Sequence, residues 1–425
     1  MKLASYWHDT AAPFAGGSEG PADRRADVAV IGGGFTGLSA GIALAKKGAE
    51  VVLLEAGRVG GGASGRNGGH CNNGLAIDFR AAAERLGLTT ARALYHAYDA
   101  GVDEVERLIG EERIDCDFQR TGKIKLAAKP AHFDELAKTY EVMVREVDPE
   151  IDLVPASGMR GEIGSDAFHG GLVFRKSASM HMGKFVAGLG DAAARRGVRI
   201  YENAPVTQLQ RVKGHEHEVV SGRGRLLASK VLLATGPSVE GPFFHFRRRI
   251  VPIGSFIIAT EPLARRVLDE IMPTRRTATT TLNIGHYFRI SPDNRLIFGG
   301  RARFALSNPS SDLKSGRILE REMRSIFPQL ERTRTDYCWG GLVDMTADRL
   351  PRAGEHDGLF YAMGYSGHGT QMSIFMGKTM AEVMNGTAAA NPFRELPWPA
   401  IPGHFGPPWF LPFVGAYFRV KDWLR

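Results

Sequence analysis

Cysteine is scarce in this chain, which has three among its 425 residues, Cys71, Cys116 and Cys338. Such sparse thiols exclude a disulfide framework and favour a reducing compartment. The first 26 residues also lack the apolar run of a signal peptide. We therefore expect a cytoplasmic protein.

The chain has no convincing membrane-spanning segment. Residues 28–45 and 398–418 are uncharged, but the first stretch contains five glycines and the second contains five prolines. The glycines favour a nucleotide-binding turn, and the prolines forbid a continuous helix. Neither stretch predicts a membrane span.

Acidic residues are slightly outnumbered, and the formal charge is +8. This excess admits nucleic acid, an anionic membrane surface or an anionic substrate as a partner. No nucleic-acid motif accompanies the scattered basic residues, so we expect no nucleic-acid partner. The sequence also offers no Ser-His-Asp or paired-carboxylate constellation, and no histidine or cysteine at metal-ligand spacing from His368. We expect no metal.

The most informative segment is a glycine fingerprint near the N-terminus. Residues 27–31 predict a buried strand, residues 36–47 a helix, and residues 49–54 a second strand ending at Glu55. Between strand and helix stands Gly32-Gly33-Gly34-Phe35-Thr36-Gly37. Such glycines permit a tight turn, close approach of the backbone to a pyrophosphate, and helix–strand packing, while the acid binds a ribose. The segment therefore predicts dinucleotide binding.

Two further glycine-rich stretches follow, at residues 58–70 and at the strand-to-helix junction 359–384. Both are typical of backbone that lies against a flat ligand. Because nucleotide-type elements recur along the chain, we predict an α/β fold with a discontinuous Rossmann-type dinucleotide-binding domain and an inserted, sheet-rich α+β substrate domain. The predicted boundaries are 1–85, 155–242 and 336–395 for the first domain, 86–154 and 243–335 for the second, and 396–425 for an aromatic, proline-rich tail.

These motifs resemble the D-amino-acid-oxidase-like flavoproteins, a family that includes glycine oxidase and sarcosine oxidase. The likeness is strongest to the γ-glutamylputrescine oxidoreductase branch. The segments that carry it are Ser5-Tyr6-Trp7, Gly62-Ala63-Ser64-Gly65-Arg66-Asn67-Gly68-Gly69, Trp339-Gly340-Gly341, Asp348-Arg349-Leu350-Pro351 and Gly367-His368-Gly369.

The resemblance implies FAD as the cofactor. The residues that it places against FAD are Gly32, Gly34, Phe35, Thr36, Gly37, Glu55, Ala56, Arg58, Gly62, Ala63, Ser64, Arg66, Asn67, Gly68, Gly69, Val206, Thr235, Gly236, Gly364, Gly367, His368, Gly369 and Thr370. Sarcosine oxidase anchors its flavin through a cysteine, but the matching position here is Gly341, with Cys338 three residues earlier. We therefore expect non-covalent FAD.

A second departure concerns the substrate. In sarcosine oxidase a lysine that binds the substrate carboxylate follows the Gly-His-Gly block, whereas this chain has Gln371 there. The resemblance therefore implies oxidation of an amine without an adjacent carboxylate: a γ-glutamyl-polyamine, a polyamine or a related secondary amine. Hydride would pass to flavin N5, and the imine would hydrolyse to an aldehyde.

Three other residues are candidates for the substrate site. We expect His70, with a pKa near neutrality, either to shape the pocket and move protons or to make a structural hydrogen bond. Tyr287 and Arg301 are candidate substrate contacts whose direction the alternation of the strand leaves open. Ile297 stands where sarcosine oxidase has a lysine that promotes reaction with oxygen. The electron acceptor is thus oxygen or another acceptor, and we expect slow reaction with oxygen.

Two other functions stay open at this point. One is an amino-acid oxidase or dehydrogenase of the sarcosine or glycine type. The other is a flavin-bearing electron-transfer subunit of a complex or membrane-associated assembly, suggested by the aromatic tail with Trp409, Phe413 and Tyr417. We favour a tail that packs on its own domain or on a second subunit of a homo-oligomer over one that contacts a membrane.

Overall fold

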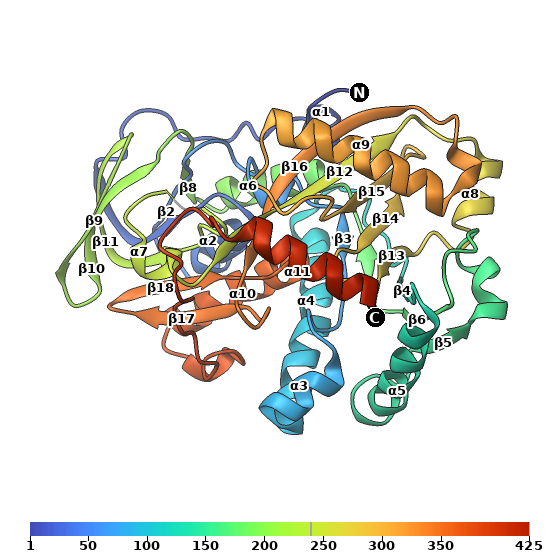
Figure 1. The fold of residues 1–425 in the computed structure, drawn as a ribbon. Helices are drawn as coiled ribbons and strands as arrows, with labels where there is room; N and C mark the ends of the chain where they lie inside the picture. The colour runs from blue at the N-terminus through green and yellow to red at the C-terminus, as the bar shows by residue number, and fades with distance from the viewer. Residues whose placement is uncertain (239, 425) are drawn as a thin grey trace.

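Figure 1 shows the computed structural model, which describes residues 1–238 and 240–424, with Leu424 described by its backbone alone. Arg425, the end of the predicted tail, lies outside the described residues. Two large sheets dominate the fold, each of eight strands within the described chain. The N-terminal glycine fingerprint belongs to the first sheet.

The first sheet has the order β17-β18-β11-β1-β2-β8, with β10 and β9 attached to β11. Its pairs β1–β2, β1–β11, β2–β8 and β11–β18 are parallel. The strands are β1 (Arg24–Ile31), β2 (Val51–Leu54), β8 (Arg199–Tyr201), β9 (Val206–Lys213), β10 (Glu216–Ser221), β11 (Gly224–Leu233), β17 (Arg352–His356) and β18 (Leu359–Met363).

Helices cover this parallel sheet, which explains its continuous apolar strands. All four residues of β2, Val-Val-Leu-Leu, are buried, as expected where both faces are covered. Helix α2 (Phe35–Lys46) packs against α6 (Met182–Arg195) and α10 (Gly369–Met384). A Cβ on Gly377 would lie 2.5 Å from the Thr36 carbonyl oxygen. Close contact between α2 and α10 therefore requires this glycine.

The second sheet has the order β16-β12-β15-β14-β13-β4-β6-β5 and is mainly antiparallel. Helix α9 packs on β12 and β16, and α5 packs on β6. The strands are β4 (Lys123–Leu126), β5 (Asp152–Pro155), β6 (Gly170–Phe174), β12 (Val251–Thr260), β13 (Thr277–Thr280), β14 (His286–Ile290), β15 (Leu296–Gly300) and β16 (Thr335–Met345).

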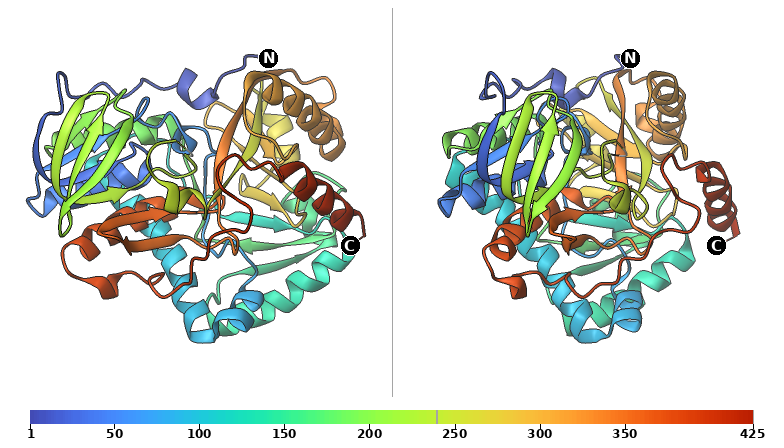
Figure 2. Two further views of the ribbon diagram at one scale, coloured as in Figure 1. Left: turned by 60° about the vertical axis from the view of Figure 1, so that its left-hand side comes forward. Right: turned by 90° about the vertical axis from the view of Figure 1, so that its left-hand side faces the viewer.

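The other elements connect and flank the sheets (Figures 1 and 2). They are α1 (Tyr6–Asp9), the short pair β3 (His70–Cys71) and β7 (Ala178–Ser179), α3 (Phe79–Leu86), α4 (Leu88–Glu112), α5 (Pro130–Glu146), α7 (Phe244–Arg247), α8 (Arg265–Ile271), α9 (Pro309–Ile326), α11 (Leu411–Leu424) and the 3₁₀ turns 63–65, 156–161, 328–330 and 388–390. Within residues 1–238 and 240–424, no helix is both long and apolar enough to cross a membrane.

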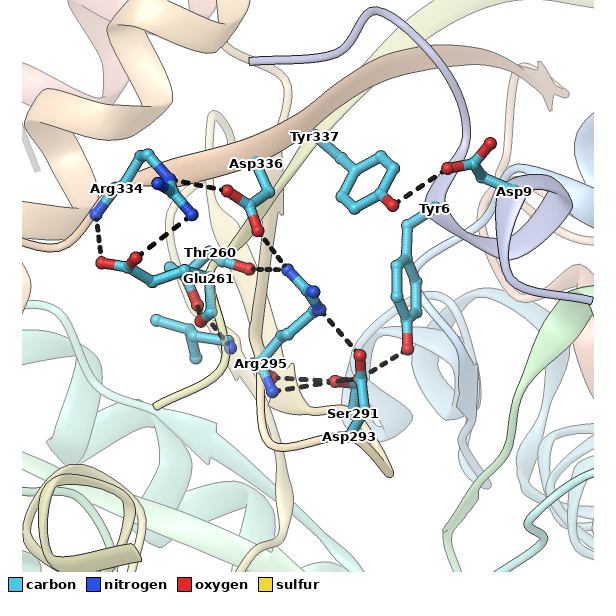
Figure 3. Close-up of polar contacts among 11 residues, drawn as sticks. Tyr6, Asp9, Thr260, Glu261, Ser291, Asp293, Arg295, Arg334, Asp336 and Tyr337 are labelled. Atoms are coloured by element: carbon cyan, nitrogen blue, oxygen red, sulfur yellow. Dashed lines mark hydrogen bonds and ion pairs between the residues drawn. The ribbon is translucent and has the colours of Figure 1, made fainter. Parts of the chain in front are cut away.

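The N-terminal arm is fixed to the second sheet by a polar network (Figure 3). Arg295 donates to Asp293 (2.7 Å) and to Asp336 (2.6 Å). Tyr6 donates to the same Asp293 at 2.5 Å. The N-terminal arm therefore includes a docked helix, α1, whose position depends on side chains from the β14–β15 turn and β16.

Several predicted boundaries differ from the observed ones. The predicted first domain includes residues 170–174 and 336–345, but β6 and β16 pair within the second sheet. Residues 80–110 have the periodicity of one helix, but Gly87, with a φ of +83°, separates α3 from α4. Residues 285–300 have a strand-like sequence, but they form a hairpin of β14 and β15. These differences arise from long-range pairing and from one left-handed turn residue.

Candidate functional site

A cavity of about 1730 Å³ is lined by residues of both sheets. Most of the predicted site residues lie on its wall, including His70, Tyr287, Arg301 and Gln371. The predicted cofactor residues among its lining are Gly32, Gly34, Phe35, Thr36, Glu55, Ala56, Gly62, Ala63, Ser64, Arg66, Asn67, Gly68, Val206, Thr235, Gly236, Gly367, His368, Gly369 and Thr370. The structure thus brings the three glycine-rich stretches together.

Four predicted cofactor residues lie elsewhere. Arg58 is exposed and outside the cavity lining. Gly37, Gly69 and Gly364 lie behind the wall: an added Cβ would lie 1.9 Å from the Gly32 carbonyl oxygen, 2.6 Å from an Arg289 nitrogen and 2.5 Å from Thr346 Cγ2, respectively. These three glycines therefore shape the wall by permitting close packing behind it.

The turn after β1 forms the first wall of the cavity. Gly32 has a φ of +114°, and a Cβ there would lie 2.4 Å from the Ala234 carbonyl oxygen. Gly34 precedes α2, and a Cβ there would lie 2.8 Å from Ser64 Oγ. The absence of side chains leaves the N-terminus of α2, whose first-turn N–H groups have no acceptor within the helix, open to the cavity.

Glu55 is held at the end of β2 by backbone donors. Gly33 N–H donates to Glu55 Oε2 at 2.6 Å, and Gly57 N–H donates to Oε1 at 2.8 Å. Each carboxylate oxygen can accept a further hydrogen bond. The carboxylate is therefore oriented and able to accept hydroxyl donors from the cavity.

The second wall, residues 60–70, is fixed from behind. Ser64 Oγ accepts a hydrogen bond from Phe35 N–H at 3.0 Å, and Asn67 Oδ1 accepts one from Gly69 N–H at 2.9 Å. The N-terminal arm adds two donors: Trp7 Nε1 to the Asn67 carbonyl (2.6 Å) and Ser5 Oγ to the Gly65 carbonyl (3.0 Å). The Ser5-Tyr6-Trp7 motif therefore clamps this wall.

The third wall is the junction between β18 and α10. Asp344, from β16, accepts a hydrogen bond from Gly364 N–H at 2.7 Å, and its carbonyl accepts one from Ser366 N–H at 3.1 Å. Burial raises the pKa of the Asp344 carboxyl to about 6. Sequence reasoning missed Asp344, since no motif indicates which β16 side chain faces a junction 20 residues later.

Two histidines present unpaired nitrogens in the buried wall of the described chain. His70 Nε2 and His368 Nδ1 are both inaccessible to solvent and have no hydrogen-bond partner. Burial, with Arg289 nearby, lowers the pKa of His70 to about 3, and burial with Lys123 nearby lowers that of His368 to about 3. The expectation that His70 titrates near neutrality is therefore wrong, because the ring is desolvated and faces cations.

Tyr287 projects from β14 into the cavity. Its hydroxyl lies 2.9 Å from Ser255 Oγ, and its ring packs edge-on against His70 at 5.5 Å. Burial raises the pKa of Tyr287 to about 12, so the phenol stays protonated. The side chain of Phe288 points to the opposite face of the sheet and lies in the core of the second sheet. Of these two neighbours on β14, Tyr287 therefore lines the cavity and Phe288 does not.

Arg289 and Ile297 do not line the cavity. Arg289 is buried behind the second wall, where it donates to the Gly69 carbonyl and, at 2.8 Å, to the Met180 carbonyl. Ile297 is fully buried in a core cluster. Arg301 does line the cavity and donates to the Asn283 carbonyl at 3.3 Å.

Gln371 lies in the first turn of α10, almost fully buried at the cavity wall. Its amide donates to the Asn72 carbonyl at 2.6 Å. Cys338, by contrast, packs in the core of the second sheet, where its thiol donates to the Asp312 carbonyl. Burial raises the pKa of the Cys338 thiol to about 12, which keeps it protonated.

The C-terminal helix covers part of the cavity. Val414 and Phe418 of α11 belong to its lining, and Phe418 stacks on Phe304 at 6.0 Å. Asp422 accepts hydrogen bonds from Asn283 N–H (3.0 Å) and Ile284 N–H (2.8 Å). The predicted tail therefore ends in a helix, and one face of this helix packs over the cavity against the second sheet.

Known proteins resemble this chain over most of its length. Residues 27–383 match the DAO family model, described as FAD dependent oxidoreductase. The chain is 32% identical over 405 residues to γ-glutamylputrescine oxidoreductase of Escherichia coli, covering 93% of this chain and 92% of that protein. It is 34% identical over 367 residues to the probable oxidoreductase OrdL of Haemophilus influenzae, covering 85% and 83%.

Among solved structures, glycine oxidase from Geobacillus kaustophilus has the same fold. The TM-score is 0.71 at 23% sequence identity, covering 88% of this chain and 100% of that one. The predicted α/β architecture and the predicted family are confirmed.

Proposed function

This chain belongs to the DAO family of FAD-dependent oxidoreductases, and from that premise we propose that it oxidises the C–N bond of an amine that has no adjacent carboxylate. The observation that carries the proposal is Gln371: an uncharged amide, already bonded to Asn72, stands at the N-terminus of α10 where an α-carboxylate would need a cation. Candidate substrates are γ-glutamyl-polyamines, polyamines and related secondary amines.

The residues present fit FAD. Glu55 would accept the ribose hydroxyls, and the α2 N-terminus with Gly34 and Ser64 would receive the pyrophosphate. The N–H groups at the start of α10 would meet the polar atoms of a flat ring system. When bound, FAD supplies the acceptor for the hydride, which carries both electrons that the amine loses.

The chain's own contribution is orientation and control of protons. Tyr287, Ser255 and neutral His70 give the substrate end uncharged hydrogen-bonding groups. The cavity cations disfavour a protonated amine, so the amine binds neutral, with its lone pair available to assist oxidation. Helix α11 limits the entry of water beside Phe304 and Phe418. The imine product would hydrolyse to an aldehyde and an amine.

The cysteine environment supports non-covalent attachment. Cys71, Cys116 and Cys338 are all buried outside the cavity lining. We expect a yellow protein whose flavin passes into the supernatant on acid precipitation. Colour that stays with the pellet would contradict non-covalent binding.

The function is tested by anaerobic reduction of the bound flavin. The holoenzyme is mixed with a panel of polyamines, γ-glutamylated diamines, glycine, sarcosine, proline and D-alanine, and loss of flavin absorbance is followed. Rapid bleaching by an amine, with an aldehyde product, is the expected result. Fastest bleaching by an amino acid would overturn the assignment and favour an amino-acid oxidase or dehydrogenase.

An amino-acid substrate is the second candidate because Arg301 lines the cavity and remains cationic. Burial lowers the pKa of Arg301 to about 10, which leaves the guanidinium charged at neutral pH. If Arg301 bound an α-carboxylate, the enzyme would prefer α-amino acids, which is the reverse of the preference expected from Gln371. The same bleaching panel distinguishes the two candidates.

A further inference from the structure

Four cationic side chains line one part of the cavity, and in the described chain none of them has an ion-pair partner. Lys123 and Lys125 come from β4, Arg301 follows β15, and Arg349 lies in the turn between β16 and β17. Their polar contacts are neutral: Lys123 donates to the Asn73 carbonyl and lies 4.2 Å above the Phe174 ring. Unpaired cations beneath the surface are costly, so an anion is expected beside them.

These cations are close enough to affect one another. Burial lowers the pKa of Lys125, and the charge of Arg349 lowers it further. Arg349 has the same effect on Arg301. Arg349 also has a φ of +64°, a conformation that costs free energy in a residue with a Cβ. The turn therefore holds a guanidinium at the cavity despite both costs.

Acidic side chains of the cavity do not neutralise this cluster. Asp78 is the acid that attracts Lys125, but its oxygens accept hydrogen bonds from Arg80 N–H (2.9 Å) and Thr139 Oγ1 (2.8 Å). Glu55 lies at the nucleotide end of the cavity, and Asp344 accepts backbone hydrogen bonds of the third wall. Asp78 therefore offsets part of the charge of Lys125 from a distance, and no carboxylate of the described chain forms an ion pair with Lys125, Arg301 or Arg349.

The β4 end is also distant from the pyrophosphate-binding turn. It is formed by α3, α5 and β4, with Phe79, Leu136 and Met143 among its lining. Figure 1 shows α3 and α5 at the opposite side of the molecule from β2 and β9. The phosphates of a dinucleotide at Gly34 and Ser64 therefore cannot be the missing anion.

We propose that Lys125 and Arg349 bind a carboxylate of the substrate that is separated by several atoms from the C–N bond being oxidised. This inference rests on the proposed amine oxidation. The proposal explains why the cavity contains unpaired cations although Gln371 offers no charge to a carboxylate adjacent to the amine. The substrate class is an amine joined through a spacer to a carboxylate, and the apolar walls of α3 and α5 contact the spacer.

A matched substrate pair tests the proposal. The monoamide of 1,4-diaminobutane with glutaric acid ends in a carboxylate, and the corresponding terminal carboxamide is neutral and similar in shape. In anaerobic bleaching of the holoenzyme, we expect the carboxylate compound to have an apparent Kd about tenfold lower. Lys125→Met and Arg349→Met should abolish this preference, so that the two compounds bind with similar Kd values.

Controls separate charge from folding and from the parent function. Lys138→Met removes a lysine that pairs with Glu135 on the exposed side of α5 and should retain the preference, and Lys125→Arg should restore most of it. Equal Kd values for the two compounds in the wild-type enzyme would overturn the subsite alone. Bleaching by neither compound, with a flavin that dithionite still reduces, would overturn the proposed function and the subsite together.

A second inference concerns the outer face of α11. Its inner face, with Leu411, Val414 and Phe418, covers the cavity, whereas the outer face carries large apolar side chains. We define the aromatic patch as Trp409, Phe413, Tyr417, Val420 and Trp423, each between 56% and 80% exposed. Figure 2 shows α11 at the periphery of the molecule.

Two basic residues lie beside the aromatic patch. Arg419 is exposed, and Lys421 lies 6.0 Å from the Tyr417 ring centre. The acid on this helix, Asp422, is occupied by the backbone of residues 283 and 284. Aromatic side chains flanked by Arg419 and Lys421 match the headgroup region of an anionic bilayer.

We infer that the aromatic patch docks the protein on an anionic lipid surface, with α11 lying in the interface. Because the inner face of the same helix covers the cavity, the docked protein would present that side of the cavity to the membrane. The holoenzyme should sediment with vesicles of phosphatidylcholine and phosphatidylglycerol (3:1), less so at high salt, and weakly with phosphatidylcholine alone.

The variant Phe413→Ser/Tyr417→Ser/Trp423→Ser should lose this sedimentation while keeping its flavin. Val212→Ser, at an exposed valine of β9, is the matched control and should sediment like the wild type. Failure of the wild-type protein to sediment would overturn the inference. A dimer in light scattering that the triple variant converts to monomer, without vesicle binding, would assign the patch to a second copy of the chain instead.

Discussion

The two sheets approach the cavity with different chemistry. The parallel first sheet presents mostly backbone to the cavity, at Gly32, at Gly34 and at the N-termini of α2 and α10. The mainly antiparallel second sheet presents side chains, among them Tyr287, Lys125 and the adjoining Arg301. One side of the cavity is defined by backbone, and the other by residue identity.

This contrast follows from what each side must bind. A pyrophosphate is recognised by N–H groups at a helix N-terminus, which any sequence supplies once glycines clear the approach. A particular amine needs charges and hydroxyls at particular points, which side chains supply. Substitutions on the first sheet should therefore affect the presence of the flavin, and substitutions on the second should affect which compound reduces it.

The largest effect is expected from Gly34→Val. The new side chain would begin 2.8 Å from Ser64 Oγ and obstruct the α2 N-terminus, so roughly nine-tenths or more of the bound flavin should be lost. The measurement is the ratio of flavin to protein absorbance after purification. Gly110→Ala, in open space on α4, is the control and should retain its flavin. A folded Gly34→Val protein with full flavin would refute the assignment of the first wall.

Reaction of the reduced enzyme with oxygen should be slow, on the order of 100-fold below its reaction with an artificial dye. A fixed cation beside the flavin ring would stabilise superoxide and so speed the reaction with oxygen. Ile297 supplies no such cation and is buried in the core. Stopped-flow reoxidation in aerated buffer measures this rate. Rapid reoxidation with stoichiometric hydrogen peroxide would contradict the expectation and would indicate that Arg301 supplies the cation. Arg301→Met should then slow the reaction.

Gln371→Lys should shift substrate preference toward α-amino acids by roughly tenfold, since it places a cation at the first turn of α10. The ratio of bleaching rates for sarcosine and for the best amine measures the shift. Gln371→Met removes the hydrogen bond to Asn72 without adding charge and separates the two effects. An unchanged ratio in the lysine variant would show that Gln371 does not decide this specificity.

The smallest effect is expected from Trp7→Phe. Loss of the hydrogen bond from Trp7 to the Asn67 carbonyl should cost about 1 kcal/mol, raising the flavin Kd a few-fold if that bond supports the second wall. Fluorescence titration of the apoprotein with FAD measures the change. Trp409→Phe removes a similar hydrogen bond, to the Gly403 carbonyl, far from that wall and should leave the Kd unaltered.

The sequence by itself determined the nucleotide-binding half of this protein. The spacing from Gly32 to Glu55, the stretch 58–70 and the junction before Thr370 each act within a local turn, so their chemistry is legible without the fold. It also identified Gln371 and Tyr287 as cavity candidates, although the direction of Tyr287 depended on the pairing of β14 with β13 and β15.

Only the tertiary structure decided the substrate half. Lys125, Arg301 and Arg349 are separated by up to 224 positions and meet because β4, β15 and the β16–β17 turn border one cavity. The neutral state of His70 and the position of Asp344 likewise depend on burial by distant segments. Local motifs specify backbone geometry, whereas desolvation and the meeting of distant charges exist only once the chain has folded.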